Sequence, residues 1–294
     1  MTEGRLPFAF GETWYRVVGD GEEPGRLPLV CLHGGPGALH DYIDSLGVLA
    51  EDGRRVVFYD QIGCGRSWVE ADPSNWTVEL FVDELRNLRD QLGLENIHLF
   101  GSSWGGMLAM EYALTQPAGL ACLVLSSSPA SIPVWAEETN RLRRELPEQV
   151  QRVLDEHEAA GTIDSPEYEA AAMEFYKLHV CRLDPWPDAV LRTFAGMEEH
   201  PDVYLTMQGP NEFVATGTLK NWDITGRLAE IRLPTLITAG RHDEFTPRQA
   251  EALNRAIAGS ELVTFESSSH MQFAEEPQRY REVVSAFLDR VEGG

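Results

Sequence analysis

Residues 97–106 read Ile-His-Leu-Phe-Gly-Ser-Ser-Trp-Gly-Gly, an apolar strand-like run that ends in a cluster of small residues. The apolar residues 107–110 follow and begin a helical pattern. The motif Gly101-x-Ser103-x-Gly105 therefore lies between a predicted strand and a predicted helix, where a sharp turn can expose a nucleophilic serine. Glycines two residues before and after the serine let the neighbouring backbone pass without a clash. This stretch predicts a nucleophilic Ser103, whose developing negative charge is favoured by the helix N-terminus.

The composition and net charge of the chain exclude some classes of binding partner. The chain has 294 residues, which is enough for one large domain or for a domain with a sizeable insertion, and 43% of them are hydrophobic. Lys and Arg total 24 against 47 Asp and Glu, which gives a formal net charge of −23. A surface this acidic repels nucleic acid and anionic membranes, so neither is expected as a partner. A cationic ligand is compatible with this charge.

Neither targeting nor metal-binding signals stand out. The first residues, Met1–Pro7, do not resemble a secretory signal, and no apolar run approaches the length of a membrane span. The spacing of the four cysteines fits neither a zinc site nor a disulfide scaffold. We interpret them as packing residues, although Cys64 lies in a glycine-rich loop that could expose it. A cytoplasmic protein without a metal or an organic cofactor is expected.

Short apolar runs alternate with helical patterns along most of the chain. Besides the strand before Ser103, strands are expected at 13–18 (a sheet edge), 29–32, 55–59, 120–126, 234–239 and 261–265. Helices are expected at 42–50, 77–92, 166–180, 248–258 and 278–291. Between 130 and 226 the strand signals stop, and helical patterns rich in aromatic residues replace them. The sequence thus predicts an α/β protein whose mainly parallel sheet has helices on both faces. Its core comprises 1–129 and 227–294, and a helical insertion at 130–226 interrupts it.

A serine nucleophile needs a base within hydrogen-bonding reach, and the base needs an orienting carboxylate. On a sheet of this kind the chain order is nucleophile, acid, histidine. Asp243 directly follows the strand at 234–239, and His270 follows the next strand after a short loop, so both are predicted at the carboxyl edge of the sheet. Glu244 is the near rival for the acid. Asp223, at the end of the insertion, is a less favoured candidate for the acid. His242 adjoins Asp243 but precedes the last strand, which is the wrong place for the base. The histidines interpreted as structural or solvent-facing are His33, His98, His157, His179 and His200.

Acyl transfer also requires two backbone N–H groups that bind the developing oxyanion. One is expected from Trp104, the residue after the nucleophile. The other is expected from the loop His33-Gly34-Gly35-Pro36-Gly37, which follows an earlier strand. Proline has no N–H to donate, and Gly35 is the best candidate in this loop.

Several segments together are specific enough to indicate a family. They are His33–Gly37, Asp60–Ser67, Gly101–Gly106, Gly209–Phe213, Gly240–Glu244 and Ser269–His270. With these segments the chain resembles the proline iminopeptidase (prolyl aminopeptidase) family of α/β hydrolases. The segments span nearly the whole chain, and the first three are diagnostic as a set. The family usually carries an arginine in the second segment where this chain has Ile62.

The resemblance implies an α/β-hydrolase fold in which the helical insertion forms a cap over the site. It also implies that acidic residues hold the free α-amine of the substrate, at positions that correspond to Glu212 and Glu244. The physical chemistry agrees, because an ammonium group buried under a cap needs carboxylate partners to offset its desolvation.

The expected activity is that of a serine exopeptidase or amidase, which releases an unblocked N-terminal residue, proline or another small apolar one, through an aminoacyl-enzyme. One alternative is an amidase that acts on amino-acid amides or on an aminoacylated natural product. A carboxylesterase that is indifferent to the amine is a more distant alternative. A non-catalytic receptor on the same fold conflicts with the intact Ser103, Asp243 and His270. An epoxide hydrolase or dehalogenase would need a carboxylate nucleophile in place of the serine.

Overall fold

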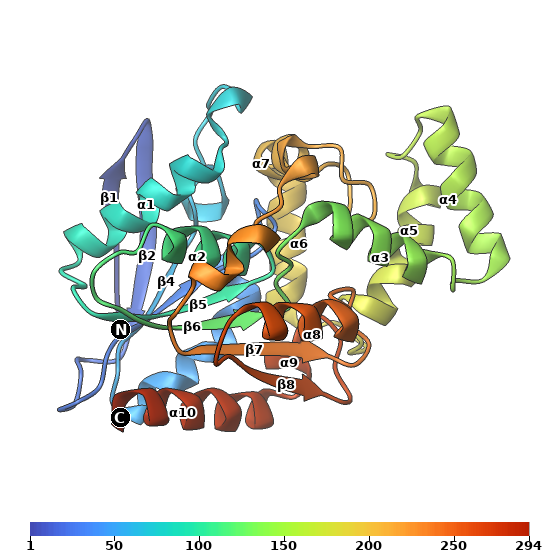
Figure 1. The fold of residues 1–294 in the computed structure, drawn as a ribbon. Coiled ribbons are helices and arrows are strands. Elements are labelled where there is room, and N and C mark those ends of the chain that lie inside the picture. Colours follow the sequence, from blue (N-terminus) through green and yellow to red (C-terminus); the bar gives the residue numbers. More distant parts are fainter. Residues whose placement is uncertain (294) are drawn as a thin grey trace.

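The computed structural model describes residues 1–293, in which eight strands form one sheet (Figure 1). The strands are β1 (Thr2–Phe8), β2 (Gly11–Val18), β3 (Leu29–Leu32), β4 (Val56–Tyr59), β5 (Ile97–Ser102), β6 (Leu120–Ser126), β7 (Thr235–Gly240) and β8 (Glu261–Phe265). Their order across the sheet is β1-β2-β4-β3-β5-β6-β7-β8. Strands β3 to β8 run parallel, β2 runs antiparallel to β4, and β1 runs antiparallel to β2. The predicted α/β class with a mainly parallel sheet is confirmed.

The helices are α1 (Val78–Gln91), α2 (Trp104–Leu114), α3 (Ile132–Arg143), α4 (Glu148–Ala160), α5 (Pro166–His179), α6 (Asp188–Glu199), α7 (Asp202–Met207), α8 (Pro247–Ala256), α9 (Gln272–Glu275) and α10 (Pro277–Gly293). A long 3₁₀ helix, η1 (His40–Asp52), follows β3. Successive residues of a strand point to opposite faces of the sheet. Val30 therefore packs into a cluster with α1, α2 and α8, whereas its neighbour Cys31 packs into a second cluster with η1 and α10. Burial on both faces explains why the parallel strands are almost wholly apolar.

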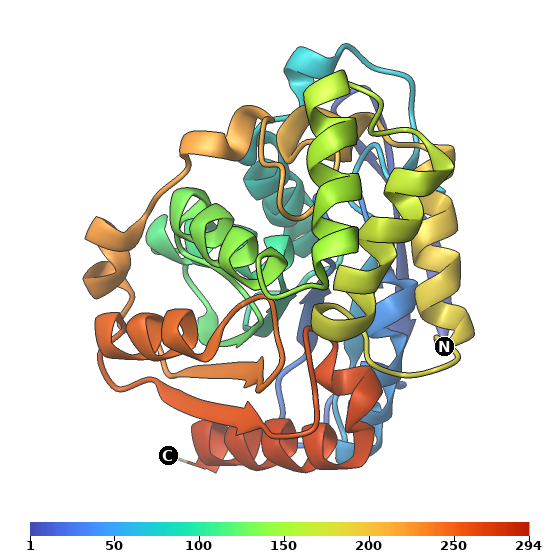
Figure 2. The same cartoon turned by 90° about the vertical axis from the view of Figure 1, so that its right-hand side faces the viewer.

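Helices α3 to α7 are inserted between β6 and β7 and lie over the carboxyl edge of the sheet (Figure 2). They have a small apolar cluster of their own, which includes Leu154, Tyr168, Phe175 and Phe213. Proline at the first or second helical position and a serine N-cap start both α3 and α5. This segment corresponds to the predicted helical insertion, and its boundaries at 130 and 226 stay a prediction.

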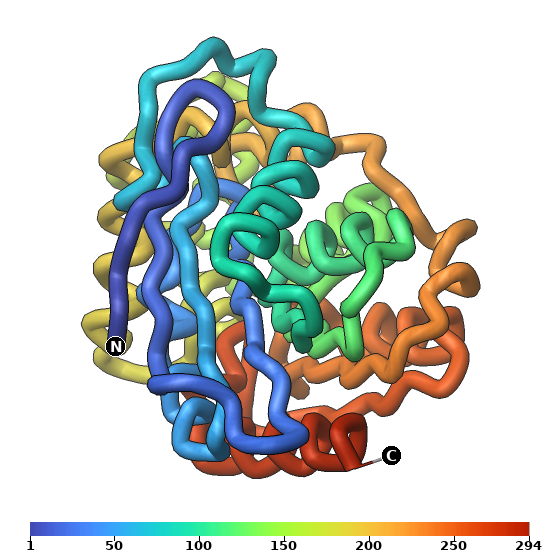
Figure 3. Tube along the Cα trace, turned by 90° about the vertical axis from the view of Figure 1, so that its left-hand side faces the viewer, coloured from blue at the N-terminus to red at the C-terminus, as the bar shows by residue number. Residues whose placement is uncertain are grey.

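One expectation about the sheet needs correction, and two short elements were not expected. The strand at 13–18 was expected at a sheet edge, but β2 is paired on both sides and β1 forms the edge outside it (Figure 3). The sequence concealed β1 because only Leu6 among its residues is buried. The short helix α9 was also not expected. All four cysteines are free and buried, Cys64 included, as expected of packing residues. None of the helices within residues 1–293 combines the length and apolarity that a membrane crossing requires.

Glu84 on α1 is fully buried beneath the loop that follows β4. Its carboxyl group accepts hydrogen bonds from the Ile62 N–H, at 2.9 and 3.1 Å, and from the Thr13 hydroxyl. Burial raises the pKa of Glu84 to about 8, although these hydrogen bonds act in the opposite direction. The folded protein therefore holds a proton on Glu84 at neutral pH.

We expect this proton to make stability depend on pH. Between the ordinary pKa of glutamate and pH 8, the unfolded chain loses the proton while the folded protein keeps it, so the free energy of unfolding falls as pH rises. The total loss is roughly 5 kcal/mol at about 1.4 kcal/mol per pH unit. In urea titrations from pH 5 to 9, the free energy of unfolding of Glu84→Gln should fall less steeply with pH than that of the parent protein. Glu79→Gln, an exposed change on the same helix, should leave the slope unaltered. Equal slopes in the parent and Glu84→Gln would contradict the assignment.

Candidate active site

Ser103 occupies the tight turn between β5 and α2. Its backbone has φ 55° and ψ −122°, a strained conformation for a residue with a side chain. The chain passes very close to its neighbours at this turn, and only a glycine fits at position 105. A Cβ on Gly105 would lie 2.2 Å from the Leu32 carbonyl oxygen. The Ser103 N–H donates to the Ser126 carbonyl at 2.9 Å, which ties the turn to the adjacent strand β6. These contacts fix the serine above the carboxyl edge of the sheet.

Asp243 and His270 follow neighbouring strands, β7 and β8, and meet at the same edge. His270 Nδ1 lies 2.8 Å from Asp243 Oδ1, and both side chains are buried. Burial alone would lower the pKa of His270, but the adjacent Asp243 carboxylate outweighs it and leaves the pKa raised. Ser103 and His270 line one cavity. The structure thus brings the three predicted triad residues to one place.

Two residues that the sequence did not single out hold Asp243. The Ser127 hydroxyl donates to Asp243 Oδ2 at 2.5 Å, and the Gln272 amide donates to the same oxygen at 3.2 Å. Gln272 also donates to Ser127 Oγ at 2.7 Å, so the two side chains brace one another. Asp243 Oδ1 additionally accepts the Phe245 N–H at 2.8 Å. The only available signal for Ser127 was its position at the carboxyl end of the strand between the nucleophile and the acid.

The two loops expected to form the oxyanion hole are connected by Gln61. Its amide donates to the His33 carbonyl at 2.9 Å, and its side-chain oxygen accepts from the Trp104 indole at 2.8 Å. Trp104 is the first residue of α2, so its backbone N–H has no acceptor within the helix. Gly35 has φ 106°, which favours glycine, and it lines the cavity together with Ser103. Both proposed donors therefore lie in braced loops beside the serine.

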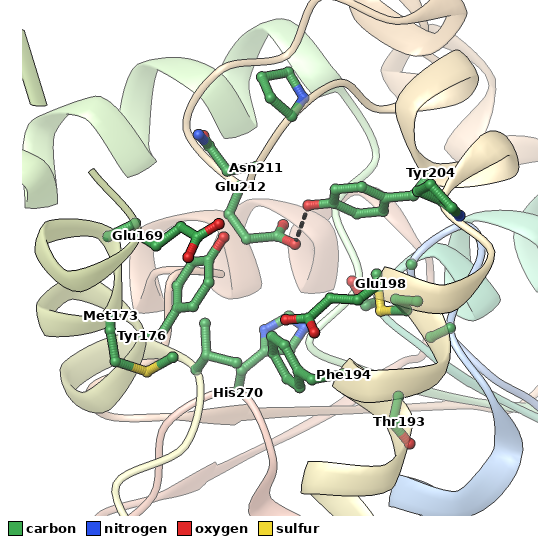
Figure 4. Close-up of a pocket in the computed structure, with 18 of the residues that line it drawn as sticks. Glu169, Met173, Tyr176, Thr193, Phe194, Glu198, Tyr204, Asn211, Glu212 and His270 are labelled. Carbon is green, nitrogen blue, oxygen red and sulfur yellow. Dashed lines mark hydrogen bonds between the residues drawn. The ribbon is translucent and has the colours of Figure 1, made fainter. Parts of the chain in front are cut away.

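Glu212 and Glu244 line the same cavity. Figure 4 shows Glu212 there, with its hydrogen bond to Tyr204. The Tyr204 hydroxyl donates to Glu212 Oε1 at 2.8 Å. Glu244 is buried, its Oε1 lies 3.6 Å from His270 Nδ1, and its Oε2 finds no hydrogen-bond partner among the described residues. Burial raises the pKa of both carboxyl groups, and the proximity of Glu212 and Asp243 raises that of Glu244 further. A cation placed between them would relieve this unfavourable burial of negative charge.

The cavity has a volume of about 380 Å³ and lies between the sheet edge and the cap helices. Apolar and aromatic side chains of α5, α6 and α7, such as Tyr176, Phe194 and Leu205, form much of its wall. Of the histidines within residues 1–293, only His270 lines it. Asp223, the other acid considered, accepts hydrogen bonds from Ser131 and Thr225 and is absent from the cavity wall.

Comparison with known proteins agrees with this geometry. Residues 28–277 match the family described as the alpha/beta hydrolase fold. The proline iminopeptidase of Saccharolobus solfataricus is 43% identical over 278 residues, which cover 94% of this chain and 88% of that protein. The chain belongs to the proline iminopeptidase family of α/β hydrolases. This membership confirms the resemblance inferred from the sequence motifs.

Solved structures of similar proteins superpose closely on this chain. The crystal structure of VinJ is 45% identical with a TM-score of 0.95, and the alignment covers 99% of each chain. The crystal structure of the proline iminopeptidase of Mycobacterium smegmatis is 43% identical with a TM-score of 0.92, again with 99% of each chain covered. The whole chain, including helices α3 to α7, therefore has the architecture of this family.

Proposed function

We propose that this protein is a serine aminopeptidase that releases an unblocked N-terminal residue, proline or another small apolar one, from peptides or amides. The observation that carries the proposal is the position of two carboxyl groups, the half-buried Glu212 and the buried Glu244, in the same cavity as Ser103 and His270. The family's curated relatives include proline iminopeptidases, which fits this reaction.

The reaction proceeds through an aminoacyl-enzyme. His270 accepts the Ser103 proton as the hydroxyl attacks the scissile carbonyl, and Asp243 orients and stabilises the imidazolium. The backbone N–H groups of Gly35 and Trp104 bind the oxyanion. The carbon–nitrogen bond then breaks, and His270 passes its proton to the leaving amine. Water, deprotonated by His270, hydrolyses the serine ester and frees the amino acid.

Recognition of the charged α-amine would make the enzyme an exopeptidase. A substrate ammonium can donate to Glu212 and to the unpaired Oε2 of Glu244, which compensates for the burial of all three groups. An acylated nitrogen carries no positive charge and leaves the carboxyl groups uncompensated. In a carboxylesterase that does not bind an amine, Glu212 and Glu244 would have no substrate group to pair with.

A second cavity adjoins Ser103 and is much smaller, about 10 Å³. Its walls include Ile132, Trp135 and Leu219. Space of this size is close to what one water molecule needs, so it suits a methyl group better than a large side chain. This supports the preference for a small apolar N-terminal residue. We accordingly expect alanyl and prolyl arylamides to have a higher kcat/KM than phenylalanyl arylamide.

The charge of the substrate amine provides the direct test. We expect free-amine prolyl and alanyl arylamides to be hydrolysed and their N-acetyl derivatives to be inert. Glu244→Gln should lower kcat/KM for the free-amine substrates by about 10²–10³-fold, because truncating one partner of a buried charge pair costs about 2–5 kcal/mol. An ester without an amine serves as the control and should react equally with both enzymes. Equal rates on free and acetylated substrates would reassign the protein as an esterase.

A further inference from the structure

The large cavity contains more negative charge than one α-amine requires. Besides Glu212 and Glu244, its wall includes Glu169 on α5 and Glu198 on α6. Figure 4 shows Glu169, Glu198 and Glu212 directed toward a common space. No lysine or arginine occurs among the described residues that line it, and His270 is its only basic side chain. Such an unbalanced cavity attracts cations and repels anions.

Glu169 and Glu198 form an outer pair that differs from the inner one. Both side chains are exposed, and they belong to two different cap helices. Within residues 1–293 no ion pair joins either of them to a basic side chain, whereas Glu174 on the same helix α5 pairs with Lys177 at 3.0 Å. The outer carboxylates are therefore free to pair with a ligand that enters the cavity.

The buried, unpartnered Oε2 of Glu244 is an independent sign that this cavity takes a cationic ligand. Glu212 already accepts a hydrogen bond from the Tyr204 hydroxyl, and Glu244 has one unpartnered oxygen, so a single ammonium group between them completes the inner pair. The α-ammonium of the substrate is that group and leaves the outer pair uncompensated. A substrate with a single amine thus pairs with the inner carboxyl groups and leaves Glu169 and Glu198 without a positive partner.

We propose that Glu169 and Glu198 form a second cation subsite, which binds an ammonium or guanidinium group on the leaving-group side of the substrate. This inference rests on the proposed function, since the inner pair must first fix the α-amine. With the α-amine at the inner pair and the carbonyl at Ser103, the part of the substrate beyond the scissile bond extends toward the exposed outer pair.

The wall next to the outer pair suits the stem of a basic side chain. Met173 lies one helical turn after Glu169, and Phe194 lies one turn before Glu198, and both line the cavity. Apolar surface of this kind covers the methylene groups of a lysine or arginine while the charged end stays in reach of the carboxylates. The preferred substrates are therefore N-terminal residues linked to a cationic partner, either the basic second residue of a peptide or a diamine.

The test compares leaving groups that differ in charge but not in size. The peptide substrates are the α-amides of alanyl-lysine, alanyl-norleucine and alanyl-glutamate, and the non-peptide pair is monoalanyl-cadaverine against alanyl-pentylamide. We expect kcat/KM for each cationic substrate to exceed that of its neutral partner by roughly fivefold to tenfold, from two partly exposed ion pairs. Higher ionic strength should reduce this preference. A preference in only one of the two sets identifies the source of the cation.

Two double variants test whether the preference for cationic leaving groups depends on Glu169 and Glu198. The double variant Glu169→Gln/Glu198→Gln should lose the preference, whereas Glu167→Gln/Glu199→Gln should keep it. The control removes the same charge from exposed positions of the same two helices that do not line the cavity. Loss of the preference in both variants, or in neither, overturns the second subsite. Binding of the same compounds to Ser103→Ala, measured by calorimetry, gives a readout that does not depend on turnover.

The two proposals can fail separately. If N-acetylated substrates react as fast as free-amine substrates, the proposed aminopeptidase function is wrong. If the free amine is required but cationic and neutral leaving groups react equally, only the second subsite is wrong.

Discussion

Replacing Ser103 with alanine is expected to lower kcat by about 10⁶-fold, the magnitude typical for loss of the nucleophile in a serine hydrolase. The variant keeps the oxyanion donors and the cavity, so substrate binding should persist while the aminoacyl-enzyme cannot form. The backbone at this position has a positive φ, which alanine tolerates no worse than serine, so the fold should be unaffected. Steady-state hydrolysis of alanyl arylamide measures the loss, and circular dichroism checks the fold.

The matched control for this change is Ser102→Ala. Ser102 is the adjacent serine in the sequence and is fully buried at the end of β5, away from the cavity wall. We expect this variant to retain activity within a few-fold of the parent. If Ser102→Ala were inactive and Ser103→Ala active, the nucleophile would have been assigned to the wrong residue.

Asp243→Asn should lower kcat by about 10⁴-fold with little change in the fold. The aspartate oxygens accept hydrogen bonds from the Ser127 hydroxyl and the Phe245 N–H, so an asparagine would have to direct its own amide group toward donors or toward His270. Either orientation disturbs the imidazole tautomer that accepts the serine proton. Kinetics at several pH values, with Asp223→Asn as the control acid, measure this effect.

The pH profile gives a second expectation for Asp243→Asn. The carboxylate raises the pKa of His270, so its removal should shift the acidic limb of the kcat/KM profile to lower pH. A variant that was merely misfolded would lose activity without moving this limb. An unchanged limb in an active, folded variant would show that Asp243 is not the partner of the base.

Strands that are buried along almost their whole length were predicted well from the sequence, and so was the partly exposed β8. Strands β3, β6 and β8 match the expected ranges 29–32, 120–126 and 261–265. For β3 and β6, burial on both faces leaves an almost continuous apolar run that is easy to recognise. Strand β1 was missed because most of its residues are exposed, and α9 was missed because four residues show no helical period.

The residues of the candidate site also differ in how far the sequence pointed to them. Ser103, Asp243 and His270 could be proposed from the sequence because each follows a strand directly or after a short loop, and parallel strands bring their carboxyl ends to one edge. Ser127 and Gln272 were not found, since their contacts join positions 116 and 145 residues apart in the chain and no local motif reports them. Glu169 and Glu198 were hidden among many exposed acids, and only the packing of the cap reveals that they share a cavity.

The insertion of the cap between β6 and β7 has a consequence for the order of folding. Leu123 of β6 pairs with Thr235 of β7, so the sheet is completed only across a loop of about 110 residues. Closing a loop of this length costs about 2 kcal/mol more entropy than closing one of a dozen residues. During synthesis, β6 therefore waits as an unpaired edge until the cap has been translated. Asp243 and His270 follow β7 and β8, so the nascent chain is expected to stay inactive until its last fifth has emerged and docked.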